Sequence, residues 1–198
     1  IYLGLDQGVS SLYRRQDEWI DEGRLPDFNA NSRTLGEDSL GRVWVGTVYE
    51  GVYQIEFSGN ANNIDQIRHF NEVDGLPGPS YNLVFSYMDD MLFGTSQGIF
   101  KFKETQENFS PLPILNAYPQ SAASYSVMSG DSVGNIFFNS ALQLIMLHKG
   151  ADNKFKARFR SFLRLPDFKI YKIYPEANGV LWLGGPEGIY RYDPSDED

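Results

Sequence analysis

The sequence predicts an all-β fold, a partial β-propeller built of four-stranded blades of ~45 residues each. Two observations predict this fold. First, one frame, two apolar runs joined by a short turn, occurs five times along the 198 residues. Second, the residues that end the first run of each copy are separated by 42, 48, 45 and 45 positions: Gly4, Gly46, Gly94, Asn139 and Gly184. A fixed period of this length with strand-like runs in every copy is typical of a repeat array.

A turn of the form Asp/Glu-x-x-Gly opens the repeat. The acidic side chain caps such a turn, and the glycine takes the left-handed position that closes it. The copies with this form are Asp38 to Gly41, Asp131 to Gly134 and Glu176 to Gly179. In the third copy Ser86 and Asp89 stand in these places, and we expect Asp89 to be left-handed because Asp tolerates that conformation better than most residues.

The first apolar run follows the turn, and its aromatic and branched residues predict a strand buried on both faces. The residues in the same register are Tyr2, Trp44, Leu92, Phe137 and Trp182. Trp44 and Trp182 are also of a type that stacks on sugars, but their register inside a buried strand favours core packing.

A Gly-x-x-x-Gly turn then predicts a tight hairpin. It spans Gly4 to Gly8, Gly94 to Gly98 and Gly184 to Gly188, with one extra residue between Gly46 and Gly51. The fourth copy has Asn139 and Gln143 in place of both glycines, which leaves its hairpin geometry open and could mark an adapted blade. Alternation in the next run places pairs of apolar residues on one face: Tyr53 with Ile55, Phe100 with Phe102, and Tyr190 with Tyr192.

Connectors with a Leu-Pro step join the copies: Leu25 to Phe28, Gly75 to Gly78 and Leu165 to Phe168. A strand candidate follows each connector and runs into the next turn: Asn31 to Glu37, Tyr81 to Tyr87 and Lys169 to Pro175, with Ser124 to Ser129 in the fourth copy. Helical periodicity is weak everywhere. Glu18 to Gly23 is the one stretch where we expect a single helical turn.

Residues 1–198 therefore form a single β-propeller fragment with approximate blades 1–25, 26–73, 74–117, 118–163 and 164–198. The first copy lacks its connector strand and the last lacks its outer strand, so three whole blades are flanked by two partial ones. A large β-sandwich is the alternative, but it does not explain the fixed period.

Composition and charge exclude several classes of function. The net charge of −9 gives no electrostatic footprint for nucleic acid or for an anionic membrane. One basic cluster alternates with apolar residues and indicates a solvated strand face: Lys154, Lys156, Arg158, Arg160 and Arg164. The absence of cysteine excludes disulfides, and no apolar run is long enough to span a bilayer. The chain begins inside a repeat without a signal peptide, so we expect any targeting or membrane segment to lie outside it.

Several segments resemble the two-component regulator propeller repeat. They are Asp74 to Pro77, Glu37 to Thr47, Phe93 to Ile99 and Gly179 to Asp193. The resemblance covers essentially the whole chain in five copies. It implies the extracytoplasmic sensor portion of a bacterial hybrid two-component system or a related membrane-bound signalling enzyme, on the periplasmic or extracellular side. It also implies a membrane helix and a cytoplasmic output module beyond this chain.

No catalytic residue, metal site or cofactor is predicted. His69 and His148 have no second ligand at metal spacing and no nucleophile elbow near them, so we interpret both as ordinary exposed or edge residues. Asp89-Asp90 and Asp196 to Asp198 do not face each other across a substrate, as a glycosidase requires. The Asp-x-x-Gly turns lack the other oxygen ligands of a calcium loop. Asn108-Phe109-Ser110 matches a glycosylation acceptor, which one triplet does by chance.

Three functions remain open. The first is a non-catalytic sensor module that binds an extracellular ligand, for instance an oligosaccharide, at the loops of one face or at its contact with a neighbouring propeller. The sequence does not identify the binding residues. The second is a propeller hydrolase or lyase acting on polysaccharide, and the third is a scaffold that only holds protein partners. In every case a propeller opened in mid-ring exposes strand edges, so we expect contact with the remainder of a propeller or self-association.

Overall fold

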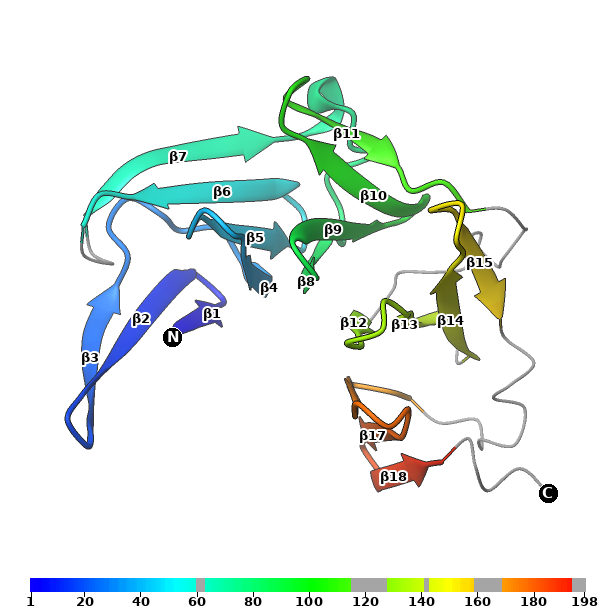
Figure 1. Cartoon of the computed structure of the whole chain (residues 1–198). Helices are drawn as coiled ribbons and strands as arrows, with labels where there is room; N and C mark the ends of the chain where they lie inside the picture. Colours follow the sequence, from blue (N-terminus) through cyan, green and yellow to red (C-terminus); the bar gives the residue numbers. More distant parts are fainter. Residues whose placement is uncertain (60–62, 115–127, 141–142, 159–168, 194–198) are drawn as a thin grey trace.

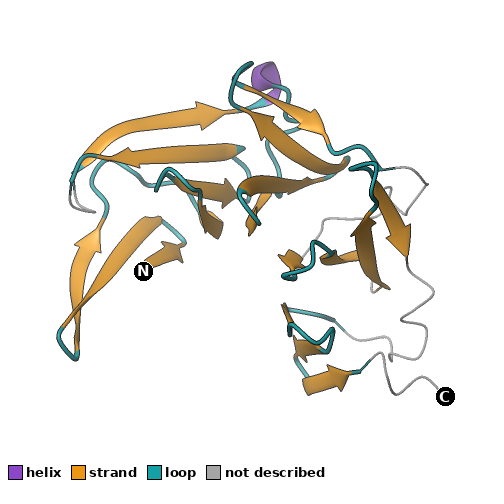
Figure 2. Cartoon of the chain, in the orientation of Figure 1, coloured by secondary structure: helices purple, strands orange, loops and turns teal. Residues whose placement is uncertain are grey.

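The computed structural model describes residues 1–59, 63–114, 128–140, 143–158 and 169–193. Their regular structure is β-strand apart from one 3-10 turn, η1 (Glu72–Asp74), as Figure 2 shows. The first sheets contain β1 (Tyr2–Leu5), β2 (Gly8–Arg15), β3 (Glu18–Arg24); β4 (Ser32–Glu37), β5 (Val43–Thr47), β6 (Val52–Phe57), β7 (Ile64–Phe70); and β8 (Leu83–Tyr87), β9 (Asp90–Thr95), β10 (Gly98–Lys103), β11 (Asn108–Pro111). The last sheets contain β12 (Met128–Gly130), β13 (Ile136–Ser140), β14 (Gln143–Lys149), β15 (Phe155–Arg158); and β16 (Lys172–Pro175), β17 (Leu181–Gly185), β18 (Gly188–Tyr192).

These five antiparallel sheets are the blades of a β-propeller, and we number them I to V in chain order. Each strand pairs with its neighbour in sequence, so every blade is a meander. Blades II, III and IV have four strands, whereas blades I and V have three. Blade I has no counterpart of β4, and blade V has no counterpart of β7 among the described residues. The predicted fold class and strand content are confirmed.

The blades are arranged radially along an open arc, with blades I and V on opposite sides of its gap (Figure 1). Strands β4, β8, β12 and β16 lie on the concave side, and β7, β11 and β15 lie on the outside. The hydroxyl of Thr34 accepts a 2.7 Å bond from the Val84 amide, and the Ser86 hydroxyl donates a 3.1 Å bond to the Glu37 carbonyl. Neighbouring inner strands therefore run side by side in the same direction.

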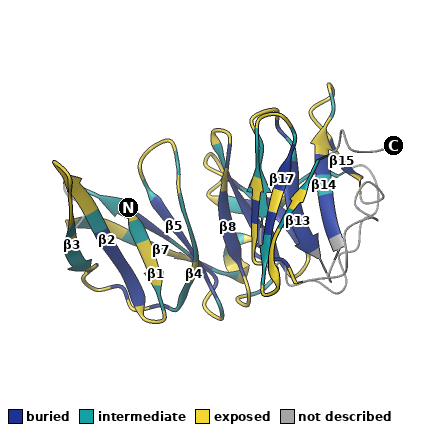
Figure 3. Ribbon diagram, turned by 90° about the horizontal axis from the view of Figure 1, so that it is seen from below, coloured by how far each residue is buried: buried dark blue, intermediate teal, exposed yellow. Residues whose placement is uncertain are grey.

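The core lies between blades. Trp44 is 1% exposed and stands at the centre of the contact between blades II and III. Its ring packs against four phenylalanines from both blades: Phe70, Phe93, Phe102 and Phe109. Figure 3 shows buried residues concentrated along the strands and exposed residues at the loops at either end. The faces of the blades are therefore used for packing, and the loops and the inner edge of the arc are the surfaces that a ligand can reach.

The Asp/Glu-x-x-Gly turns form as predicted. In the first of them Asp38 accepts backbone bonds of 3.0 Å from Leu40 and from Arg42, and Gly41 has a φ of 77°. The third copy corrects the expectation for Asp89. Met88, with a φ of 51°, is left-handed instead, because Tyr87 pairs directly with Asp90 and only two residues remain to turn the chain.

Two further expectations are wrong. Residues Glu18 to Gly23 form no helical turn but belong to β3, because Trp19 and Ile20 pair across the sheet with β2. Trp182 is 36% exposed, unlike Trp44, since no described sheet packs on its side of blade V. The register predicted the blade position of Trp182 correctly, but burial also requires a neighbouring blade.

The hairpin of the fourth copy forms without glycine. Asn139 of β13 pairs with Leu144 of β14, so these strands turn back on each other as in the other blades. Some sequence assignments lie outside the described residues: the connector 165–168, most of the candidate strand 124–129, Arg160, Arg164 and the tail 196–198.

Candidate functional site: the axial hollow

The inner strands enclose a hollow of about 590 Å³ on the concave side of the arc. It is lined by residues of four blades, which are distant in sequence and come together only through the propeller. The polar and aromatic side chains among them are Arg33, Thr34, Phe85, Ser86, Lys169, Tyr171 and Lys172. We call this surface the axial hollow, and its size is that of a small-molecule site.

Arg33 reaches the axial hollow because of a β-bulge. Ser32 pairs with Thr47 and Thr34 pairs with Gly46, so Arg33 is an extra residue with no partner on β5. A bulge breaks the alternation of a strand and redirects the side chain at the extra position. The pairings of β8, β12 and β16 with their neighbours are continuous, so β4 alone among the described inner strands carries this feature.

Lys169, Tyr171 and Lys172 stand opposite, at the start of the inner strand of blade V. The ammonium of Lys169 lies 5.3 Å from the centre of the Tyr171 ring. In the same way the guanidinium of Arg33 lies 5.7 Å from the centre of the Tyr81 ring. Each side of the axial hollow thus presents a cation beside an exposed aromatic face.

Tyr49 extends the aromatic surface beside Arg33. Its ring centre is 6.0 Å from that of Tyr81, and Tyr49 is 67% exposed. Tyr49 lies in the β5–β6 loop, the one with the extra residue between Gly46 and Gly51. Tyr81 is held left-handed, with a φ of 55°, and its amide donates a 2.8 Å bond to the Val48 carbonyl. A bulky residue in this conformation is uncommon and typical of functional sites.

The charge of the axial hollow is one-sided. None of the described residues that line it is acidic. Across the described part of the chain, no carboxylate forms an ion pair with Arg33, Lys169 or Lys172. Glu37, on the same strand as Arg33, lies toward blade I, where its charge adds to burial in raising the pKa of Tyr2. The axial hollow is therefore basic in a protein whose net charge is −9.

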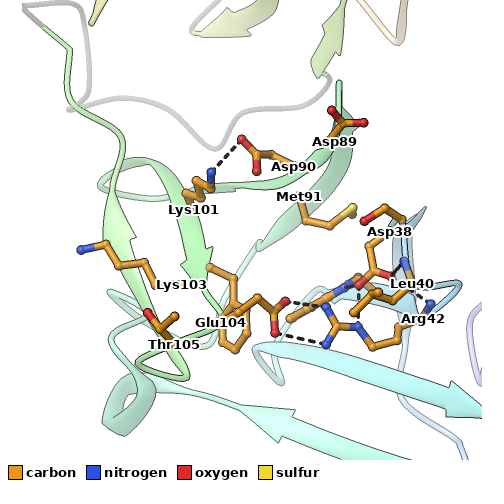
Figure 4. Close-up of a pocket in the computed structure, with 13 residues that line it drawn as sticks. Asp38, Leu40, Arg42, Asp89, Asp90, Met91, Lys101, Lys103, Glu104 and Thr105 are labelled. Atoms are coloured by element: carbon orange, nitrogen blue, oxygen red, sulfur yellow. Dashed lines mark hydrogen bonds and ion pairs between the residues drawn. The ribbon is translucent and has the colours of Figure 1, made fainter. Parts of the chain in front are cut away.

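A second pocket of about 420 Å³ lies at the other end of the strands, between blades II and III (Figure 4). Five of its charged residues form ion pairs, whereas Asp89 and Lys103 form none among the described residues. Arg42 binds Asp38 at 2.7 Å and makes a two-pronged contact with Glu104 of blade III at 2.5 and 3.2 Å. Lys101 binds Asp90 at 2.7 Å. The Arg42–Glu104 contact joins blades II and III, and the other two contacts lie within one blade, so most of this charge is already used by the fold.

Asp38 is the centre of this second pocket. Burial of its side chain works to raise its pKa, but hydrogen bonds from Trp44 and Arg42 outweigh burial and hold the pKa below its ordinary value. A carboxylate that stays ionised and fully bonded is suited to structure. It is not suited to donate a proton to a substrate.

Both histidines are exposed, in agreement with the interpretation as exposed or edge residues. The Nε2 of His69 donates to the Glu50 carbonyl at 2.6 Å, and its ring stacks on Tyr53 at 4.4 Å in blade II. His148 lies within β14, and its Nδ1 is 2.8 Å from the Asn135 side-chain oxygen. Neither histidine lines the axial hollow.

The other candidate chemistries find no support in the described residues. They hold no group of three or more His, Asp or Glu side chains placed for a metal ion. Asn108 lies within strand β11, whereas glycan acceptors lie in surface loops. Burial raises the pKa of Tyr53, with Glu50 adding to it, and burial also raises the pKa of Tyr87, so neither is an activated base. No helix in this part of the chain has the length and apolar character to cross a membrane.

Sequence reasoning missed the residues that build the axial hollow. Two signals pointed toward it: the extra residue before Gly51 and the polar character of the connector strands. Neither signal shows that Arg33 and Lys172 face one space, because that depends on how the blades are set around the axis.

No protein-family model matches the chain, and no curated protein sequence matches it. Solved structures do. The extracellular domain assigned to a hybrid two component system of B. thetaiotaomicron has a TM-score of 0.71 at 18% identity over 97% of this chain. A second such domain from the same organism has a TM-score of 0.70 at 19% identity over 98% of this chain. This chain spans only 24% and 26% of those two chains, respectively.

Another kind of propeller also matches. A catalytically inactive virginiamycin B lyase from Staphylococcus aureus, solved with quinupristin, has a TM-score of 0.63 at 12% identity. The match covers 97% of this chain and 64% of the lyase chain. At these identities the likeness establishes the fold, and the chain is a β-propeller like all three.

Proposed function

We propose that this chain is part of the extracytoplasmic ligand-sensing propeller of a bacterial two-component or related signalling receptor, and that it is not itself an enzyme. The observation that carries the proposal is the axial hollow. It is a concave surface with free polar groups, shared by four blades. A ligand that touches several blades at once is well placed to change their relative positions, which is how binding can bias an output domain.

The repeat pattern and the solved structures support the same setting. The pattern resembles the two-component regulator propeller repeat, and the matched B. thetaiotaomicron proteins are extracellular domains of two component systems. A periplasmic or extracellular location belongs to this proposal.

The coding sequence downstream of this segment tests the signalling part. We expect it to encode an apolar segment of about 20 residues followed by a kinase, cyclase or other output module. A stop codon shortly after Asp198 would contradict a receptor and leave the enzyme and the scaffold as the remaining functions.

A lyase is the second candidate, because a lyase of the same fold matches the chain. The axial hollow holds no histidine and no carboxylate among its described residues, but Lys169, Tyr171 and Lys172 are of types that can act as an acid or a base. An assay for release of unsaturated or reducing sugar ends from a panel of polysaccharides separates the two. We expect ligand-induced stabilisation of the chain without product, and turnover at any rate above a heat-killed control would favour the enzyme. A scaffold would show neither effect.

A further inference from the structure

We propose that Arg33, Lys169 and Lys172 bind a multiply charged anion in the axial hollow, and that Tyr49, Tyr81 and Tyr171 support the ring or chain that carries its charges. This names the ligand class for the proposed sensing site and rests on that proposal only in placing the sensed ligand there. The ligand class follows from the charges, the shape and the exposed rings.

The charges point to an anion because no described carboxylate neutralises them. Each of the three cations lines or borders the hollow, and none pairs with a carboxylate in the described part of the chain. A cluster of like charges repels itself, so it disfavours folding unless a counter-charge arrives. In a protein with a net charge of −9, three unpaired cations on one concave surface are not explained by the overall composition.

The second pocket provides an internal comparison. There, Arg42 pairs with Asp38 and Glu104 and Lys101 pairs with Asp90, while Lys103 forms no ion pair with a described residue (Figure 4). The chain therefore supplies carboxylates where its cations serve the fold. No carboxylate among the described residues lines the axial hollow, so we expect the partner there to come from solution.

The backbone is built to present this site. Three departures from the repeat occur close together in blades II and III: the bulge at Arg33, the extra residue in the loop of Tyr49, and the left-handed Tyr81. None of them improves a core contact, because Arg33, Tyr49 and Tyr81 are all exposed. All three turn a polar or aromatic side chain toward the same end of the inner strands.

The tyrosine rings indicate what kind of molecule carries the negative charges of the ligand. Tyr49 and Tyr81 meet edge to face, at an angle of 70°, and so form a corner open to solvent. Tyr171 stands with Lys169 on the opposite side. Exposed aromatic faces beside cations bind ring-shaped or chain-shaped anions better than compact inorganic ones, because the rings bury apolar carbon surface while the cations pair with the charges.

Titration of the chain with tri-galacturonate, which has three carboxylates, tests the proposal. The neutral methyl ester of the same trisaccharide and inorganic sulfate are the comparison probes. We expect tri-galacturonate to bind and the other two to bind at least about tenfold more weakly. We also expect its affinity to fall several-fold between roughly 0.05 and 0.5 M NaCl, since exposed charges are screened over this range.

Single substitutions assign the residues. Arg33→Gln, Lys169→Gln and Lys172→Gln are each expected to weaken tri-galacturonate about three- to tenfold, as exposed charge contacts do, and the triple variant about 30-fold or more. Lys103→Gln, which removes the same charge at the second pocket, is the matched control and is expected to leave affinity unchanged. Unaltered melting curves verify that each variant is folded.

Several results would overturn the proposal. These are equal binding of the ester, affinity that does not depend on salt, loss of affinity in Lys103→Gln as large as in the other variants, and failure of both tri-galacturonate and a sulfated disaccharide to bind at millimolar concentration. If a neutral oligosaccharide binds, and if Tyr49→Ala abolishes this binding while the Gln variants do not, then the anion proposal is wrong but the sensing proposal is still supported. If the chain binds the anion but the full protein has no output module, then the anion proposal is supported and the sensing proposal is wrong.

Discussion

The indole nitrogen of Trp44 donates a 2.7 Å hydrogen bond to a carboxylate oxygen of Asp38, six residues earlier. The same contact recurs in blade V, where Trp182 donates to Glu176 at 2.6 Å. In blade II the carboxylate also receives Arg42, which in turn binds Glu104 of the next blade. Asp38 thus connects a turn, the central core residue and an inter-blade ion pair.

Replacing Asp38 should therefore destabilise the fold. Asp38→Asn removes the charge that binds Arg42 and turns an amide group toward the donors of Trp44 and Arg42. Because the Asp38 side chain is only 6% exposed, water replaces these bonds poorly, and we expect a loss of about 1.5–3 kcal/mol in the free energy of unfolding. Urea denaturation measures it. Asp89→Asn, an exposed acid of the neighbouring turn, is the control and should change stability by less than about 0.5 kcal/mol. Equal effects of the two substitutions would refute this role of Asp38.

The pH dependence follows from the same residue. The pKa of Asp38 is lower in the folded protein than its ordinary value, so the folded state binds this proton less readily than the unfolded chain. Its contribution to stability is fully present above the unfolded pKa of about 3.9 and is lost as the pH falls through the folded pKa. Denaturation midpoints between pH 6 and pH 2 should thus fall less steeply in Asp38→Asn than in the wild type. Parallel curves would show that Asp38 is not linked to folding in this way.

Gly46 and Gly184 occupy equivalent positions in the repeat but should respond differently to substitution. A Cβ on Gly46 would lie 2.2 Å from the Asn82 carbonyl oxygen and 2.6 Å from the Thr34 hydroxyl. A Cβ on Gly184 would meet only the Lys172 Cβ at 3.7 Å, which is ordinary contact. Gly46→Ala must push blades II and III apart and should cost about 2 kcal/mol or more, whereas Gly184→Ala should cost less than about 1 kcal/mol. Thermal melts of both variants compare them directly, and a Gly46→Ala protein as stable as the wild type would contradict the close approach.

The comparison of Gly46 with Gly184 also shows which features of the fold the sequence can predict. The repeat of Gly46, Gly94 and Gly184 was sufficient to predict blades, hairpins and the order of strands, because these depend on local turn chemistry and on alternation within each copy. The packing around each copy depends on the neighbouring blades and cannot be predicted from the copy's own residues. Trp44 and Trp182 share a register, yet one is buried and the other exposed, because burial depends on the next blade.

The axial hollow was unpredictable for the same reason. Arg33 and Lys172 are far apart in sequence, and only the angle between successive blades brings them to one space. The bulge that redirects Arg33 follows from the pairing of Ser32 and Thr34 with β5, which alternation alone would not predict. The Met88 turn was missed because the length of a two-residue hairpin, and not the preference of Asp89, decides which residue is left-handed.

The uncovered face of blade V gives a last prediction. Tyr174 pairs with Trp182 and Gly184 pairs with Ile189, so these side chains share one face, while Ile173 and Leu183 on the other face pack against blade IV. Tyr174 is 61% and Ile189 is 76% exposed. By the same pairings Lys172 and Arg191 also lie on this face, but its large apolar side chains resemble the inter-blade contact around Trp44 with one blade removed. We therefore expect this chain, on its own, to cover the face with a second copy.

Sedimentation velocity between about 1 and 100 μM tests this, and a population of dimers that grows with concentration is expected. Ile189→Asp places a charge in the middle of the face and should weaken the dimer at least tenfold, because the unpaired charge would be buried on association. Val133→Asp is the matched control, since Val133 is equally exposed but lies in the β12–β13 turn, away from the face. A monomer at every concentration, or equal weakening by both substitutions, would mean that the open face of blade V is stable in water as it stands.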